Sequence, residues 1–138
     1  MLSLWVSLGH LVLQADPTLS FNRDIRPILS AYCLECHGPD GQQRKGGGKQ
    51  GLRLDTLQGA TEDLGGVSAV IPGDADASLM IQRILTNDMD DRMPPIEHGK
   101  SLSLDQIESL KTWVNQGANY EYIRQIFPTK QTQTTSVQ

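Results

Sequence analysis

The chain has 138 residues, a length typical of one domain, and a formal net charge of −4 at pH 7. This mild acidic excess argues against a protein whose main partner is nucleic acid, because such proteins usually carry a basic face. Only 38% of the residues are hydrophobic and 5% aromatic, beside 13 glycines, so a large apolar group bound at the centre would add to the stability of the fold.

The N-terminal residues 1–15 carry no charge and form an apolar run that is too short for a membrane span, which takes about 20 residues. The run is typical of a secretory signal peptide cleaved after Ala15, although no Lys or Arg precedes it. A buried N-terminal helix and a misassigned start codon are the alternatives. We expect an exported, periplasmic or extracytoplasmic protein with a domain over residues 21–120, no membrane span after cleavage, and a disordered polar tail over residues 128–138.

Hydrophobic periodicity predicts an all-α fold with long irregular loops. The first helix is expected to begin at residue 22 or 26 and to end at residue 36. A brief second helix is expected over residues 55–66, a third over residues 78–86 and a fourth over residues 103–117.

Polar residues at the expected helix starts predict their caps. Asp55 is expected to cap the second helix, and Asp76 or Ser78 the third. Ser103 and Gln106 form a capping-box pattern at the start of the last helix. The apolar stripe of that helix is expected at Leu104, Ile107, Leu110 and Val114. The glycine-rich loop over residues 39–51 holds three basic residues, Arg44, Lys45 and Lys49, which are expected to be solvated. A contact of one of them with a haem propionate or with an acidic patch of a partner is the alternative.

The segment 33–37, Cys-Leu-Glu-Cys-His, has the C-x-x-C-H pattern of covalent c-type haem attachment. Two thiols three positions apart share a helical face, so each can add to one vinyl group on the same edge of a porphyrin. A disulfide, a redox C-x-x-C and half of a zinc site are the alternatives, but zinc needs four ligands and a thioredoxin-like motif needs a βαβ unit. We therefore predict one covalent haem c on Cys33 and Cys36, with His37 as an axial ligand of its iron.

Met93 is the candidate for the opposite face of the iron. It lies far enough downstream of His37 for a loop to cross to that face, and Pro94 and Pro95 restrict its backbone. Histidine with methionine is the ligand pair of electron-transfer cytochromes c, and it raises the reduction potential. The alternatives are two other methionines and a histidine: Met80, expected in the core, and Met89 and His98, expected on the surface.

Other residues are expected around the haem. Arg53 and Arg92 are candidates to pair with its propionates, because a guanidinium suits a carboxylate, with simple solvation as the alternative. Tyr32 and Trp113 are candidates to pack on the porphyrin, and helix–helix packing is a compatible explanation. The full set of expected pocket residues is Tyr32, Leu52, Arg53, Leu54, Arg92, Pro94 and Trp113.

Several segments, in order, resemble the planctomycete-type cytochrome c domain: residues 24–29, 33–38, 51–55, 71–74 and 92–95, and the helix through residues 113–118. The resemblance implies an exported domain with a compact cytochrome c-like helical fold around one covalent haem. It also implies that Cys33 and Cys36 bind the haem, with His37 as its proximal and Met93 as its distal ligand. In that family the domain usually stands at the front of a much longer chain. A free-standing cytochrome, a truncated product and a fragment therefore all stay open.

A haem with both axial positions filled exchanges electrons but offers no site for substrate. The expected function is therefore electron transfer with a redox protein partner, and no catalytic residue is assigned. One alternative is a haem enzyme domain, peroxidase-like or the redox half of a larger oxidoreductase, with His98 and Arg92 beside an open iron position. Another is a haem-stabilised sensing or interaction module.

Overall fold

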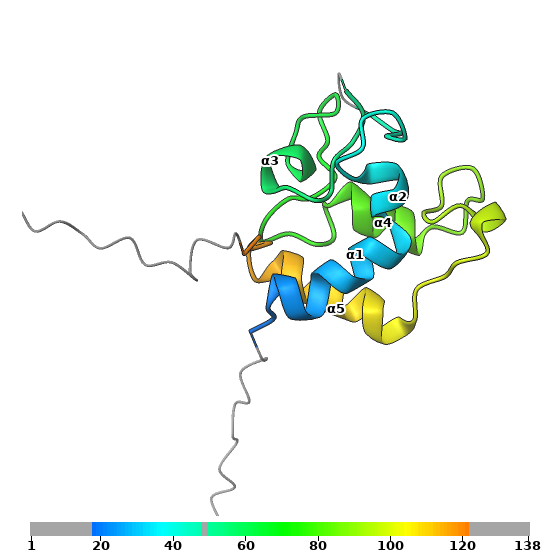
Figure 1. Cartoon of the computed structure of the whole chain (residues 1–138). Helices are drawn as coiled ribbons and strands as arrows, with labels where there is room; N and C mark the ends of the chain where they lie inside the picture. Colours follow the sequence, from blue (N-terminus) through cyan, green and yellow to red (C-terminus); the bar gives the residue numbers. More distant parts are fainter. Residues whose placement is uncertain (1–17, 48–49, 122–138) are drawn as a thin grey trace, which may run out of the picture.

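The computed structural model describes residues 18–47 and 50–121, and over these ranges the chain is helical without β-strands (Figure 1). The expected signal peptide and polar tail lie outside the described residues. None of the helices in the described ranges combines the length and the hydropathy of a membrane span. The predicted all-helical class is confirmed for this part of the chain. Its elements are η1 (Phe21–Ile25), α1 (Arg26–Tyr32), α2 (Leu34–His37), α3 (Leu57–Ala60), α4 (Leu79–Leu85), η2 (Ile96–His98) and α5 (Leu104–Asn115).

The first predicted helix is divided into three pieces. A π-helical turn, η1, leads directly into α1, and Pro27 lies in the first turn of α1, where its missing N–H is tolerated. The backbone leaves helical geometry at Cys33, where φ is −125°, and α2 then continues to His37. The Cys33 N–H still donates to the Leu29 carbonyl at 2.8 Å, and the Cys33 carbonyl accepts from the His37 N–H at 2.9 Å. The hydrogen-bonded chain therefore runs through the break and fixes how α2 leaves α1.

Three aromatic rings from distant parts of the sequence form the centre of the core. The Trp113 ring lies 5.7 Å from that of Phe21 and 5.1 Å from that of Tyr120, measured between ring centroids. Trp113 is 1% exposed, and its Nε1–H donates to the Asn119 carbonyl at 3.2 Å. Figure 1 shows α5 running beside η1, and these two elements carry Trp113 and Phe21. Such ring pairs stabilise the fold beyond the area that they bury.

The predicted capping box at the start of α5 is confirmed. The Ser103 hydroxyl accepts from the Gln106 N–H at 3.2 Å, and the Gln106 side chain accepts from the Ser103 N–H at 2.9 Å. The predicted stripe is wrong at Leu104, which is 84% exposed. Leu104 is the first residue of the helix, and the core lies against the C-terminal half of α5. Trp113 is buried there together with Leu110 and Val114.

The second predicted helix is shorter than expected and has a different cap. The Thr56 hydroxyl accepts from the Gly59 N–H at 3.2 Å, and α3 ends at Ala60. Asp55 does not cap it, because the Asp55 carboxylate binds the Arg53 guanidinium, with Nε and Oδ1 2.9 Å apart. The position of Asp55 in the sequence suggested a capping role, but its carboxylate pairs with Arg53 instead.

The third predicted helix is α4, and Ser78 stands at its N-cap position as expected. The buried Ser78 hydroxyl makes no capping bond. It donates to the Asp74 carbonyl at 2.7 Å and accepts from the Ile71 N–H at 2.8 Å. Ser78 therefore closes the turn that precedes α4.

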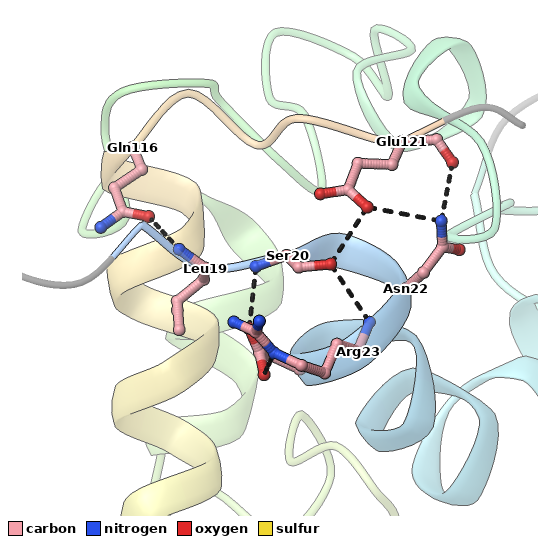
Figure 2. A network of polar contacts seen from close by, with 7 residues as sticks. Leu19, Ser20, Asn22, Arg23, Gln116 and Glu121 are labelled. Atoms are coloured by element: carbon pink, nitrogen blue, oxygen red, sulfur yellow. Dashed lines mark hydrogen bonds and ion pairs between the residues drawn. The ribbon is translucent and has the colours of Figure 1, made fainter. Parts of the chain in front are cut away.

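The two ends of the described chain are joined by a polar network (Figure 2). The Ser20 hydroxyl donates to the Glu121 carboxylate at 3.0 Å, and the Asn22 amide donates to the Glu121 backbone carbonyl at 3.2 Å. The Leu19 N–H donates to the Gln116 side chain at 3.0 Å. These contacts hold the segment before η1 against the segment after α5, so the aromatic core is closed at this end.

Candidate cofactor pocket

A pocket of about 610 Å³ is lined by residues of α1, α2, α4 and η2 and of the loops that follow these elements. This volume lies within the range of roughly 300–1,000 Å³ that is usual for small-molecule and cofactor sites. Its wall is mainly apolar, and the aliphatic side chains that line it include Leu52, Leu54, Leu64, Val67, Leu79, Met80, Ile84 and Leu102. The wall therefore suits a large, flat apolar group better than a charged metabolite.

The four side chains predicted to hold a haem all line this one pocket. Cys33, Cys36 and His37 come from the break and from α2, whereas Met93 comes from the loop after α4. Fifty-five or more residues of chain separate the two groups, so the fold and not the local sequence brings them together. A c-type haem with two axial ligands uses two thiols for covalent attachment, and an imidazole and a thioether as iron ligands.

The His37 imidazole is oriented by a backbone carbonyl. Its Nδ1 lies 3.1 Å from the Lys45 carbonyl oxygen, which can only accept, so Nδ1 carries the proton. The remaining nitrogen, Nε2, is then free to donate its lone pair to a metal, which is the usual arrangement for a ligating histidine. Burial lowers the pKa of His37, and this favours the neutral, ligating form.

The loop that carries Lys45 is hydrogen-bonded to the segment 33–37, which holds the two cysteines and His37. The Lys45 N–H donates to the Cys36 carbonyl at 2.8 Å, and the Leu54 N–H donates to the His37 carbonyl at 2.8 Å. Gly46 has φ of +87°, and a Cβ there would lie 3.2 Å from the His37 ring carbon Cε1. A glycine is therefore needed for both the backbone conformation and the close approach to the imidazole.

Both cysteines are free thiols in the described chain, and neither forms a disulfide. Burial raises the pKa of the Cys33 thiol to about 11, so it is protonated at neutral pH. Redox-active C-x-x-C sites instead lower the pKa of the attacking thiol. Among the described residues, no group of three or more His, Cys, Asp or Glu side chains is placed to hold a metal ion. The pocket geometry thus suits thiols that are held against an apolar group.

Comparison with known proteins bears on the same segment. Residues 33–97 match the family model described as Planctomycete cytochrome C. The family resemblance predicted from the sequence is confirmed. The matched segment begins at Cys33 and includes His37 and Met93, so it covers all four side chains that are predicted to hold a haem.

One curated relative is the hydrazine synthase subunit alpha of Kuenenia stuttgartiensis, which is 29% identical over 136 residues. The alignment covers 82% of this chain but only 17% of that subunit. The chain therefore spans a small part of the curated relative that it matches. No solved structure matches this chain.

Four of the other expected pocket residues line the cavity: Tyr32, Leu52, Leu54 and Pro94. Three others, Arg53, Arg92 and Trp113, are not part of its wall. Arg53 binds Asp55, and Trp113 belongs to the aromatic core. Of the alternative distal ligands, Met80 and His98 line the pocket, whereas Met89 is 64% exposed and lies outside it.

Arg44 has a role that the sequence did not indicate. Its guanidinium donates to three backbone carbonyls, those of Gly38 at 3.0 Å, Pro39 at 2.9 Å and Gln50 at 3.1 Å. It therefore closes the loop after the attachment motif and is not merely solvated, as was expected for the basic residues of this loop. Gly51 leaves room for this side chain, because a Cβ there would lie 2.8 Å from Cγ of Arg44. The density of glycines around Arg44 is the feature of the sequence that could have indicated this role.

Proposed function

We propose that the chain binds one haem c in this pocket and transfers electrons through it. In this proposal Cys33 and Cys36 would form thioethers with the haem, and His37 and Met93 would ligate its iron. The observation that supports it most is that one apolar pocket collects these four side chains from two distant segments. The match of the same residues to a cytochrome c family supports it independently.

Each residue has a defined chemical task. Each cysteine thiol adds across a vinyl group, so that sulfur bonds one vinyl carbon and the thiol hydrogen goes to the other, with no net oxidation. His37 offers the Nε2 lone pair that its bond to the Lys45 carbonyl leaves free. Met93 offers a neutral thioether, which favours the reduced iron and so raises the reduction potential. The bound haem supplies the ferric–ferrous couple.

The proposal includes export and a redox protein as partner. Thioether attachment of haem is normally carried out outside the cytoplasm, and residues 1–15 have the composition of a secretory signal. With both axial positions filled, electrons must pass through an exposed edge of the porphyrin. The partner is therefore expected to be another protein that carries a redox centre.

The test is to produce the chain together with a c-type haem maturation system. Intact mass should show one added haem, and a pyridine haemochrome spectrum should show the thioether-linked type. Replacing both Cys33 and Cys36 by Ser should abolish the added mass. A wild-type protein that folds under these conditions without gaining covalent haem would contradict the proposal.

The distal ligand is tested separately. Met93→Ala should lower the reduction potential and should allow carbon monoxide to bind the ferrous protein at once. Met89→Ala is the matched control, because Met89 is exposed and outside the pocket. Equal behaviour of the two variants would exclude Met93 as ligand. Met80→Ala and His98→Ala would then identify which of the other two pocket residues takes its place.

A second candidate function is a haem domain within an enzyme, and the similarity to a hydrazine synthase subunit favours it. Such a domain needs an open or displaceable iron position, and His98, which lines the pocket, is then available as a distal base. Tight, immediate binding of carbon monoxide to the ferrous wild-type protein would favour this candidate. Absence of binding would favour the electron carrier.

A further inference from the structure

The backbone of Met93 is attached to the end of α4. The last carbonyls of a helix have no partner within it, and that of Arg83 is one of these. It accepts from the Met93 N–H at 2.9 Å. The loop that leaves α4 at Thr86 therefore returns, at Met93, to the last turn of this helix. Ile84, which follows Arg83 in that turn, also lines the pocket.

The Arg83 side chain holds the same loop at a second point. Its Nη1 donates to the Asp91 carbonyl oxygen at 3.0 Å and to the Asp91 carboxylate at 2.7 Å. Asp91 stands two residues before Met93, so one residue of α4 contacts both ends of the segment 91–93. Arg83 also lines the pocket itself.

We propose that Arg83 is a positioning residue for the distal ligand, acting through Asp91. The proposal rests on the proposed function, because it takes Met93 as the iron ligand. A thioether is a weak ligand, and the fraction of time that it stays on the iron depends on how much freedom its loop must lose. The Arg83–Asp91 pair removes part of that freedom before the ligand binds, and its charge-assisted bonds are stronger than neutral ones.

Arg83 could instead act by pairing directly with a haem propionate, since it lines the pocket. The two explanations differ in the role of Asp91. If Arg83 acts through Asp91, Asp91→Asn weakens the contact with the carboxylate, whereas Arg83→Gln removes that contact and the bond to the Asp91 carbonyl, so the double variant is no worse than Arg83→Gln alone. If Arg83 pairs with a propionate, the effects of the two substitutions add.

The experiment measures how readily added imidazole displaces the thioether from the ferric holoprotein, followed by loss of the methionine-to-iron charge-transfer band. Arg83→Gln and Asp91→Asn should each bind imidazole about two- to fivefold more tightly than the wild type, as expected for a partly exposed ion pair. The double variant should show the same increase as Arg83→Gln, and Arg83→Lys a smaller one. Arg26→Gln and Asp76→Asn, which change exposed residues away from the pocket, are the matched controls and should have no effect.

Each other outcome overturns the proposal in a recognisable way. If Met93→Ala abolishes the band but Arg83→Gln and Asp91→Asn bind imidazole like the wild type, Met93 is the ligand and Arg83 does not position it. Additive effects would assign Arg83 to another partner. If the wild type lacks the band and Met93→Ala changes nothing, the proposed ligation fails, and this proposal fails with it. Should Arg83→Gln not fold, Asp91→Asn decides alone, because its carboxylate is 59% exposed and its loss threatens folding less.

Discussion

Trp113 offers a test of whether the aromatic core and the pocket are separate. The structure places Trp113 between Phe21 and Tyr120, away from the pocket wall, whereas the sequence suggested that it packs on the porphyrin. Trp113→Phe removes the Nε1–H bond to the Asn119 carbonyl, worth about 1 kcal/mol, and leaves a void in a site that is 1% exposed. Complete truncation of a buried Trp costs about 3–5 kcal/mol, so this partial one should cost about 2–3 kcal/mol in all.

For a domain of this size, that loss should lower the midpoint of thermal unfolding by about 10 °C. The assay is thermal unfolding of the holoprotein followed by far-ultraviolet circular dichroism, together with its visible spectrum and reduction potential. The spectrum and the potential should not change. Leu104→Ala is the control, because Leu104 is 84% exposed and its loss should cost less than about 0.5 kcal/mol. A shift of the potential in Trp113→Phe, or an unchanged midpoint, would refute the separation of core and pocket.

Three further substitutions test local features. Gly46→Ala should destabilise the fold by about 1–2 kcal/mol in urea unfolding, because φ is +87°, and should alter the visible spectrum, because the new methyl group meets the His37 ring. Ser103→Ala should cost about 0.5–2 kcal/mol in the same assay through loss of the capping box, and an unchanged midpoint would contradict this. The hydrogen bond from Arg53 lowers the pKa of Asp55 below its ordinary value of 3.8, so this carboxylate stabilises the fold above that pH and its contribution is lost as the pH falls through the lowered pKa. The difference in unfolding free energy between the wild type and Asp55→Asn should therefore shrink from about pH 6 to about pH 3, and a constant difference would be evidence against the pair.

Local sequence signals predicted the parts of the fold that depend on neighbours in the chain. The capping box of Ser103 and Gln106 needs residues only three positions apart, and it forms as expected. The break at Cys33 was not predicted, because nothing in the residue types there disfavours a helix. It arises where α2 must turn to present the two cysteines and His37 to the pocket. The cap of α3 was also not predicted. Arg53, which binds the Asp55 carboxylate, was visible in the sequence, but the contact between the two side chains was not.

The sequence allowed us to predict the pocket residues whose side chains have distinctive chemistry. It did not allow us to predict the residues that act by binding backbone carbonyls. Two cysteines, a histidine and a methionine beside two prolines are recognisable because few other tasks need them. Arg44 and Arg83 carry no such mark, because each binds carbonyl oxygens that every residue possesses. Which carbonyls lie within reach of a guanidinium depends on how the loops close, and that is settled only by the tertiary fold.

The two aromatic residues that were expected to pack on the porphyrin lie in different places. Tyr32 lines the pocket, whereas Trp113 packs against Phe21 and Tyr120. Three aromatic rings, including that of Trp113, gather where η1, α5 and residue 120 meet, and most of the apolar side chains of the pocket wall are Leu, Val, Ile and Met. Rings that pack on one another gain from their mutual geometry, whereas flexible aliphatic side chains adapt better to a flat guest. On this argument, the aromatic cluster packs without a cofactor, whereas the pocket wall is the part whose packing a bound haem would complete.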